Sequence, residues 1–290
     1  MGCKIVRTKN LLKFTQPVLM QSYHDKFNLP KKSYRTPAPA GSVLVAGKKE
    51  EALSPAMQKK YCSGMGKAMH AMQYSKPATY NAVQDLSCHM HKATQDHFKV
   101  MVHVLKYSFD TIEQGLVLKP NRKWDGSQSH KFVISGCSNL DCANEPKCRC
   151  SVSGHVVYLE GVPAMFKSST QRTLSLSTTK AETYAGVTCL QDMLYMKNVL
   201  ELLRLKVKLP MVLEMDNQGA VYLANNRSIG GRTRQIDVQS VFLRELKEAG
   251  VLVIKWIAGA VNEADIFTKN LDGPTFQQYT RIFTGGTEYD

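Results

Sequence analysis

The pattern of hydrophobic and polar positions in the first 120 residues is that of a mainly helical region. Apolar residues recur at intervals of three and four between residues 55 and 107, most clearly at Phe98, Met101 and Leu105. This spacing predicts amphipathic helices that each bury one face. A short alternating stretch and a helix that begins at Pro17 come before them. Residues 29–41 contain three prolines, which predicts an extended connector, because proline fits neither a helix interior nor a central strand.

The pattern changes after the polar, turn-rich residues 121–130, where shorter apolar runs alternate with helical stretches. These runs predict strands over 132–140, 153–160, 163–167, 211–215 and 251–257, and helices over 179–205, 217–225, 236–249 and after Asn262. Their order predicts an α/β fold with a mixed five-stranded sheet and flanking helices. We therefore expect a smaller, mainly helical region at 1–120, a linker at 121–130 and an α/β domain at 131–290.

Charge and cysteine content narrow the possible functions. The net charge of +14 is uneven, because residues 1–125 hold 20 Lys and Arg against 8 Asp and Glu, whereas residues 126–290 hold 18 against 16. A basic region of this kind is typical of polyanion binding, although a solvated basic surface has the same composition. Eight irregularly spaced cysteines, with no leader and no apolar run approaching 18 residues, predict an intracellular protein with reduced thiols and no membrane segment.

Three acidic residues in the second half are candidate ligands of a divalent cation. Glu182 lies in STTKAET, Asp216 in EMDNQGA and Asp265 in NEADIFTK, each at the start or end of a predicted element. Carboxylates carried by a strand and helix framework can converge on such a cation. Each residue also has a purely structural interpretation. Thr179 and Glu182 have the spacing of a capping box, Asp216 stands where a helix N-cap is expected, and Asp265 lies near a helix start, where an acid faces the dipole.

Five blocks of the second half stand in a definite order. They are SNLDCANEPKCRCSVSG at 138–154, LSTTKAETYA at 176–185, MDNQGAV at 215–221, GRTRQIDVQSVFLRE at 231–245 and ADIFTKNL at 264–271. In content and order they resemble the ribonuclease H domain of copia-type retrotransposon polyproteins. The α/β domain is therefore expected to have a ribonuclease H-like fold.

The first half is similar to the region that follows the polymerase palm in the same polyproteins. The stretches GCKIVRTKNLLKFTQPVLMQSYHDKF, TPAPAG and KPATYNAVQDLSCHMHKATQDHFKVMVHVLKY carry this likeness. The resemblance implies that residues 1–120 are the thumb and connection of a reverse transcriptase. No YxDD-type motif occurs, so we expect no polymerase active site in this chain.

The resemblance implies metal-dependent hydrolysis of the RNA strand of RNA·DNA hybrids. Family members use four carboxylates and two Mg²⁺ (or Mn²⁺) ions, and Glu182, Asp216 and Asp265 match three of the four. Asn139 stands at the position of the first carboxylate, with Asp141 two residues further along the same strand face, about 6.5 to 7 Å away. A neutral amide cannot bridge two cations, and Asp141 could replace it only if the strand bulged or slid. We expect weakened hydrolysis with hybrid binding retained.

The expected partners follow from the same likeness. Arg232, Arg234 and Lys269 are candidate contacts to nucleic acid, although a solvated basic loop equally accounts for the two arginines. An RNA·DNA hybrid is the expected substrate, and a palm and fingers polymerase domain is a possible partner in trans. The expected location is a cytoplasmic particle or the nucleus. A catalytically inactive nucleic-acid-binding remnant and a host-recruited module of the same fold are the alternative functions.

Overall fold

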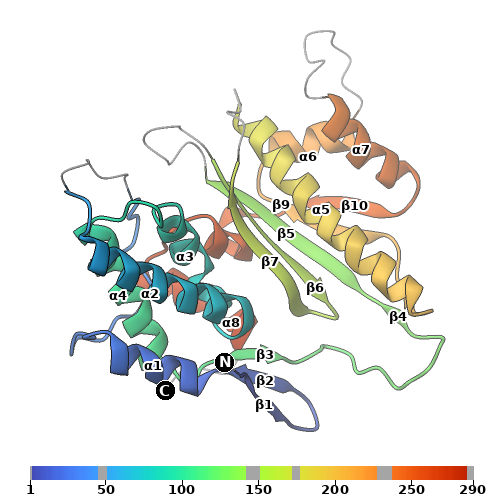
Figure 1. The fold of residues 1–290 in the computed structure, drawn as a ribbon. Helices are drawn as coiled ribbons and strands as arrows, with labels where there is room; N and C mark the ends of the chain where they lie inside the picture. Colours follow the sequence, from blue (N-terminus) through green and yellow to red (C-terminus); the bar gives the residue numbers. More distant parts are fainter. Residues whose placement is uncertain (1, 45–50, 142–150, 172–176, 227–236, 286–290) are drawn as a thin grey trace. The chain divides into compact units, whose positions relative to one another are not determined.

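The computed structural model describes residues 2–44, 51–141, 151–171, 177–226 and 237–285 (Figure 1). Contacts divide these residues into two compact units. The first unit contains the described residues up to Lys119 together with those from Lys269 onward, and the second contains those from Pro120 to Thr268. None of the described helices is both long enough and apolar enough to cross a membrane.

The first unit is mainly helical, as its apolar spacing predicts. Its elements are β1 (Lys4–Arg7), β2 (Leu12–Thr15), α1 (Pro17–Lys26), α2 (Pro55–Tyr74), η2 (Pro77–Thr79), α3 (Tyr80–Ser87), α4 (Gln95–Asp110), β3 (Leu116–Leu118) and α8 (Gly273–Thr284). The strands form one antiparallel sheet in the order β1-β2-β3. Side-chain oxygens of Ser54 and Thr94 accept hydrogen bonds from the first turns of α2 and α4, which fixes where these helices begin. Tyr61, Met65 and Leu105 are fully buried in the core between them.

The C-terminal helix α8 packs within the first unit, which differs from the expected extent of the α/β domain to residue 290. Phe276 of α8 lies edge-on to Tyr107 of α4, with 5.8 Å between ring centroids. The helix ends at Gly285, whose left-handed φ of 67° places it against β3, where an added Cβ would lie 2.9 Å from Val117 Cγ1. The apolar face of α8 is therefore buried against α4 and β3.

The second unit is an α/β fold on a mixed five-stranded sheet, as predicted. Its elements are β4 (Lys131–Phe132), β5 (Ile134–Asp141), β6 (Val152–Leu159), β7 (Val162–Thr170), α5 (Thr178–Leu202), β8 (Lys206–Val207), β9 (Met211–Met215), α6 (Gln218–Asn225), α7 (Asp237–Glu248), β10 (Leu252–Trp256), η3 (Gly259–Val261) and η4 (Glu263–Phe267). The strand order is β10-β9-β5-β6-β7. Strand β6 is antiparallel to β5 and β7, whereas β9 is parallel to β5 and β10. This arrangement is compatible with a ribonuclease H-like fold.

Different helices pack on the two faces of this sheet. Helix α5 lies along one face (Figure 1), where an added Cβ on Gly136 would come within 2.7 Å of Cys189 Sγ. The short helix η4 lies on the other face, where an added Cβ on Gly154 would come within 2.7 Å of Phe267 Cβ. Since side chains alternate along a strand, Gly154 and its cross-strand partner Asn139 face η4.

The segment after Asn262 differs from the single helix that we expected. The structure contains the 3₁₀ helix η4, followed by residues 268–272 and then by α8. The side chain of Asn262 accepts a hydrogen bond from Ala264 N–H and so caps η4. Asp265 consequently lies inside a short, tight turn.

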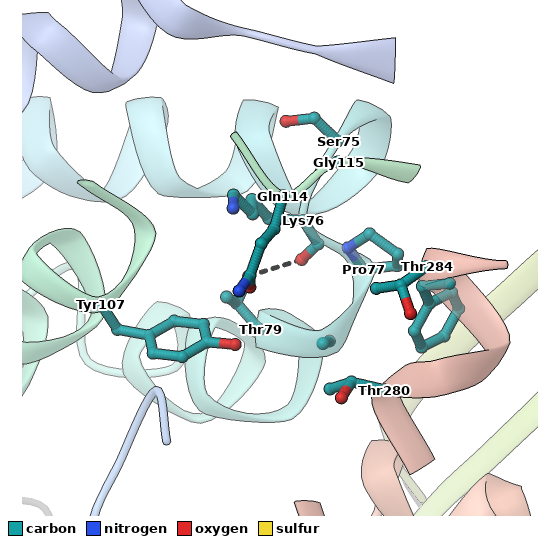
Figure 2. Close-up of a pocket in the computed structure, with 11 residues that line it drawn as sticks. Ser75, Lys76, Pro77, Thr79, Tyr107, Gln114, Gly115, Thr280 and Thr284 are labelled. Atoms are coloured by element: carbon teal, nitrogen blue, oxygen red, sulfur yellow. Dashed lines mark hydrogen bonds between the residues drawn. The ribbon is translucent and has the colours of Figure 1, made fainter. Parts of the chain in front are cut away.

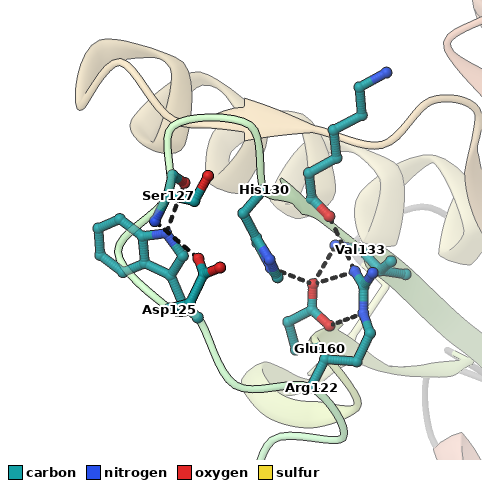
Figure 3. Close-up of polar contacts among 8 residues, drawn as sticks. Arg122, Asp125, Ser127, His130, Val133 and Glu160 are labelled. Carbon is teal, nitrogen blue, oxygen red and sulfur yellow. Dashed lines mark hydrogen bonds and ion pairs between the residues drawn. The ribbon is translucent and has the colours of Figure 1, made fainter.

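The predicted linker at 121–130 is tied to the second unit through buried Glu160 (Figure 3). Arg122 donates two hydrogen bonds to the Glu160 carboxylate, at 2.9 and 2.7 Å, and Val133 N–H donates a third at 2.9 Å. Burial alone would raise the pKa of Glu160, but the hydrogen bonds from Arg122 and Val133 outweigh burial and hold that pKa below its usual value. The Glu160 carboxylate thus fastens this stretch to the turn between β6 and β7.

Lys76 is a buried lysine in the first unit, beside a small cavity to which Thr79, Tyr107 and Thr280 contribute (Figure 2). Its ammonium donates to the backbone oxygen of Thr111 and, at 2.8 Å, to Thr111 Oγ1. Burial, with a smaller effect of Lys13, lowers the pKa of Lys76 to about 7. The neutral amine is therefore favoured in the folded protein.

Lys76→Met should remove a pH dependence from the stability of the protein. The pKa of Lys76 is about 7 in the folded protein and about 10.4 in an unfolded chain. Between these values the unfolded state binds more protons, so stability rises with pH. We expect the parent to gain on the order of 2 to 4 kcal/mol relative to the variant between pH 7 and 10, measured by urea unfolding. Lys99→Met, at an exposed lysine, is the control that should show no such change. A constant difference between parent and Lys76→Met would contradict a buried charge at this position.

Candidate active site

Four polar side chains from distant parts of the sequence are brought to one edge of the five-stranded sheet. Asn139 lies near the end of β5, and Asp216 follows the last residue of β9. These parallel strands pair in register up to Ser138 and Met215, so the next residues, Asn139 and Asp216, lie on neighbouring strands about 4.8 Å apart. Glu182 comes from the beginning of α5 and Asp265 from η4.

Asn139 and Asp265 are in direct contact. The Asn139 amide donates a hydrogen bond to Asp265 Oδ1 and lies 3.4 Å from Thr268 Oγ1. Both residues are buried, with exposed fractions of 4% for Asn139 and 8% for Asp265. The Asn139 amide thus stabilises the buried carboxylate of Asp265. A carboxylate at residue 139 would instead repel it.

Glu182 is buried close to the other two acids. Its exposed fraction is 6%, and its Oε2 atom has no hydrogen-bond partner among the described residues. Burial, followed by repulsion from Asp216 and Asp265, raises the pKa of Glu182 to about 8. Glu182 therefore lies within electrostatic reach of both Asp216 and Asp265.

The capping interpretations of Glu182 and Asp216 do not hold in this fold, whereas Asp265 does lie in the first turn of η4, where an acid faces the helix dipole. Helix α5 is capped by Ser177, which accepts from Lys180 N–H, so Thr179 and Glu182 do not form a capping box. Asn217 caps α6 by accepting from Ala220 N–H. Asn262 caps η4, so capping does not explain why Glu182, Asp216 and Asp265 lie together.

Two further residues hold this arrangement in place and were not singled out in the sequence. Buried Asn262 donates from Nδ2 to the backbone oxygen of Ser138 at 3.0 Å, which ties η4 to β5 beside Asn139. Trp256 donates from Nε1 to the backbone oxygen of Asp216 at 2.9 Å. Asn262 stands two residues before the ADIFTK block and Trp256 ends the last apolar run, but neither position alone reveals its partner.

The remaining candidates are Asp141, Arg232, Arg234 and Lys269. The register between β5 and β6 is unbroken from Ile134 to Asp141, so no bulge moves Asp141 into the place of Asn139. Arg232 and Arg234 lie outside the described residues. Lys269 is exposed and begins the C-terminal segment that packs with the first unit.

Comparison with known proteins identifies relatives of the chain. The retrovirus-related Pol polyprotein from transposon RE2 of Arabidopsis thaliana is 27% identical over 218 residues, which are 75% of this chain and 14% of that protein. The corresponding polyprotein from transposon TNT 1-94 of Nicotiana tabacum is 27% identical over 276 residues, or 93% of this chain and 20% of that protein. This chain is a relative of the transposon Pol polyproteins. The predicted resemblance to retrotransposon polyproteins is thereby confirmed.

Two findings qualify the relation to the Pol polyproteins. The chain spans 14% to 20% of the length of these polyproteins, and no protein-family model matches it. The secreted RxLR effector protein 161 of Plasmopara viticola is also similar, with 29% identity over 122 residues, which are 42% of this chain and 80% of that protein. Related sequence thus occurs in a much shorter protein as well.

The acids of this Pol-related chain suit a hard cation in chemical type. Carboxylate oxygens are the donors that Mg²⁺ and Mn²⁺ prefer, and Glu182 Oε2 is a buried acceptor with no partner among the described residues. As the side chains stand, however, no group of three or more His, Cys, Asp or Glu residues in the described ranges could hold a metal ion. Asp265 already accepts a hydrogen bond from Asn139, so this bond would compete with a cation for its carboxylate.

Glu182→Gln should stabilise the protein at high pH when no divalent cation is present. The pKa of Glu182 is raised from 4.5 to about 8, so between these values the folded state binds more protons and stability falls as pH rises. A neutral amide removes this loss. We expect the variant to gain on the order of 2 to 4 kcal/mol over the parent between pH 5 and 8.5, measured by urea unfolding in EDTA.

The control for this substitution is Glu201→Gln, on the same helix but at an exposed residue paired with Lys197. It should leave the pH dependence unchanged. If parent and Glu182→Gln lost stability in parallel with rising pH, the three acids would not be repelling one another.

Proposed function

We propose that the second unit is a ribonuclease H-type nuclease module of a copia-type polyprotein, with turnover strongly weakened at residue 139. Its substrate would be the RNA strand of an RNA·DNA hybrid. The observation that carries this proposal is the convergence of Glu182, Asp216 and Asp265 on Asn139 at one sheet edge. The family relation supports a retroelement context, and the basic first half is consistent with a polyanionic partner.

Each acid has a definite part in the proposed reaction. Glu182, Asp216 and Asp265 would hold Mg²⁺ or Mn²⁺, which when bound activates a water molecule and neutralises charge on the leaving oxygen. Glu182, protonated at neutral pH in the cation-free protein, would have to release its proton to act as a ligand. The hydrogen bond from the Asn139 amide would compete with a cation for the Asp265 carboxylate. Both effects would lower the affinity of the site for a cation.

Asn139 is the residue that limits turnover in this proposal. Its amide carries no charge and offers one oxygen, so it cannot bridge two cations as a carboxylate does. In the structure its nitrogen faces Asp265, which leaves the chain with three carboxylates for a site that uses four in the family it resembles. We therefore propose retained hybrid binding with slow hydrolysis.

A cleavage assay tests the proposed activity. Labelled RNA·DNA hybrid is incubated with the parent chain and with Asp216→Asn, in Mg²⁺ and separately in Mn²⁺. We expect slow cleavage by the parent and a loss of about 100-fold or more in the variant, because removing one charged ligand costs several kcal/mol. Cleavage that survives Asp216→Asn would point to a contaminating nuclease and contradict the assignment.

Asn139→Asp should raise the cleavage rate. Restoring the fourth carboxylate is expected to increase the rate about 100-fold, since 1.36 kcal/mol corresponds to a factor of ten. The same variant should lose stability in EDTA, because a second buried carboxylate would face Asp265. Asp141→Asn is the matched control on the same strand and should leave the rate unchanged. An Asn139→Asp variant that is folded and no faster than the parent would argue against the site.

A second candidate function is an inactive hybrid-binding remnant or a host-recruited module of the same fold. Two observations favour it. Asn139 compensates Asp265 without a cation, and a related sequence makes up most of a protein named as a secreted effector. Hybrid binding by the parent without cleavage in either cation would support this candidate. The proposal of a nuclease module also includes two further points. A palm and fingers domain would act in trans, and the protein would be located in a cytoplasmic particle or the nucleus.

A further inference from the structure

Trp256 is a half-exposed aromatic residue beside the candidate active site. It ends β10, which is the outermost strand of its sheet, and 48% of the residue is exposed. Its Nε1–H, the one polar group of the side chain, donates to the backbone oxygen of Asp216 at 2.9 Å. The indole is therefore held by its edge next to a candidate ligand, while about half of its surface faces solvent.

Packing and hydrogen bonding do not by themselves account for an indole at this position. A tryptophan contributes to a core by burying a large apolar surface, and Trp256 leaves about half of its own uncovered. Its hydrogen bond to a carbonyl at the end of a strand contributes about 1 kcal/mol and does not require an exposed ring face. The carboxylate of Asp216 lies close by, since Asp216 Oδ2 is 3.4 Å from the position of an added Cβ on Gly259 in η3.

We propose that Trp256 is a stacking platform for an unpaired nucleobase that adjoins a hybrid bound at Glu182, Asp216 and Asp265. This inference rests on the proposed function and specifies its substrate. Aromatic side chains bind bases through their faces and tolerate any base. Inside a continuous duplex both faces of each base are covered by neighbours, and a base at a blunt end is still held by pairing, so an unpaired base is the one that can turn its face to a side chain. The preferred ligand is thus a hybrid with a single-stranded extension.

The two tryptophans of the chain allow a direct test. Trp124 packs edge-on against Phe132, before the start of β5, whereas Trp256 lies by the opposite end of that strand. Trp124→Phe keeps an aromatic ring on Phe132 and makes Trp256 the single indole fluorophore. Trp256→Phe leaves Trp124 as the reporter of a distant part of the same unit. Circular dichroism checks that each variant is folded.

The fluorescence experiment titrates both proteins, without added Mg²⁺, with a blunt RNA·DNA hybrid and with the same hybrid carrying a single-stranded extension. We expect the extended hybrid to quench Trp256 in the Trp124→Phe protein, the blunt hybrid to quench it much less, and Trp124 in the Trp256→Phe protein to change with neither. Equal quenching by both hybrids, or none in spite of binding, would overturn the platform.

Affinity measurements complete the test. Anisotropy of labelled hybrids should show that Trp256→Ala weakens binding of the extended hybrid by about 5- to 150-fold, as expected for one stacked base, and leaves the blunt hybrid unchanged. Trp256→Phe, which keeps a ring but loses the N–H, should retain most of the affinity. A Phe variant as weak as the Ala variant would assign Trp256 to holding Asp216 instead. A parent that binds neither hybrid removes the proposed function as well, whereas a parent that binds both, with both indifferent to Trp256→Ala, removes the platform alone.

Discussion

The hydrogen bond from Asn139 to Asp265 is the interaction on which the candidate site depends. Burying a carboxylate is costly unless it is paired with a donor or a cation. Three carboxylates lie together here, and two of them, Glu182 and Asp265, are buried. The amide of Asn139 compensates Asp265, and a retained proton compensates Glu182. The site can therefore remain folded without a cation, because Asn139 is a neutral amide and Glu182 keeps its proton at neutral pH.

This contact exists because the sheet lets η4 come close. Gly154 pairs with Asn139 across the antiparallel ladder, and any side chain at Gly154 would collide with Phe267, Thr268 and the backbone of Ala264. The glycine thus sets the distance at which η4 packs on the sheet. Asn262 then joins η4 to the backbone of β5. The position of Asp265 is fixed from both sides by residues that carry no charge.

Sequence patterns were sufficient to predict the helices and strands whose hydrophobic residues recur with a clear period. The apolar runs around β5, β9 and β10 and the long helix α5 follow from spacing alone, and the sequence blocks pointed to Glu182, Asp216 and Asp265. Local rules could not decide whether Glu182 and Asp216 took part in caps, because Ser177, two residues before Thr179, and Asn217, one residue after Asp216, are equally good caps. The packing partner of α8 could not be predicted either, since an amphipathic pattern shows that a helix buries one face but not which surface it packs against. Trp256 was missed for the same reason, because its role depends on a contact with the neighbouring strand.

The residue at position 139 affects stability and catalysis in opposite ways: an amide favours the cation-free fold, and a carboxylate would favour hydrolysis. A carboxylate there would add a fourth negative charge to the cluster, so the folded state would come to depend on bound cations. The amide removes that dependence, and with it the bridging ligand that two-cation chemistry needs. This exchange leaves unchanged the half-exposed Trp256, which we propose as a contact to nucleic acid and which is bonded to the backbone of Asp216. With an amide at residue 139, such a chain can lose hydrolysis and still remain folded. Hydrolysis is lost first because residue 139 belongs to the buried cluster of acids that would bind the cations.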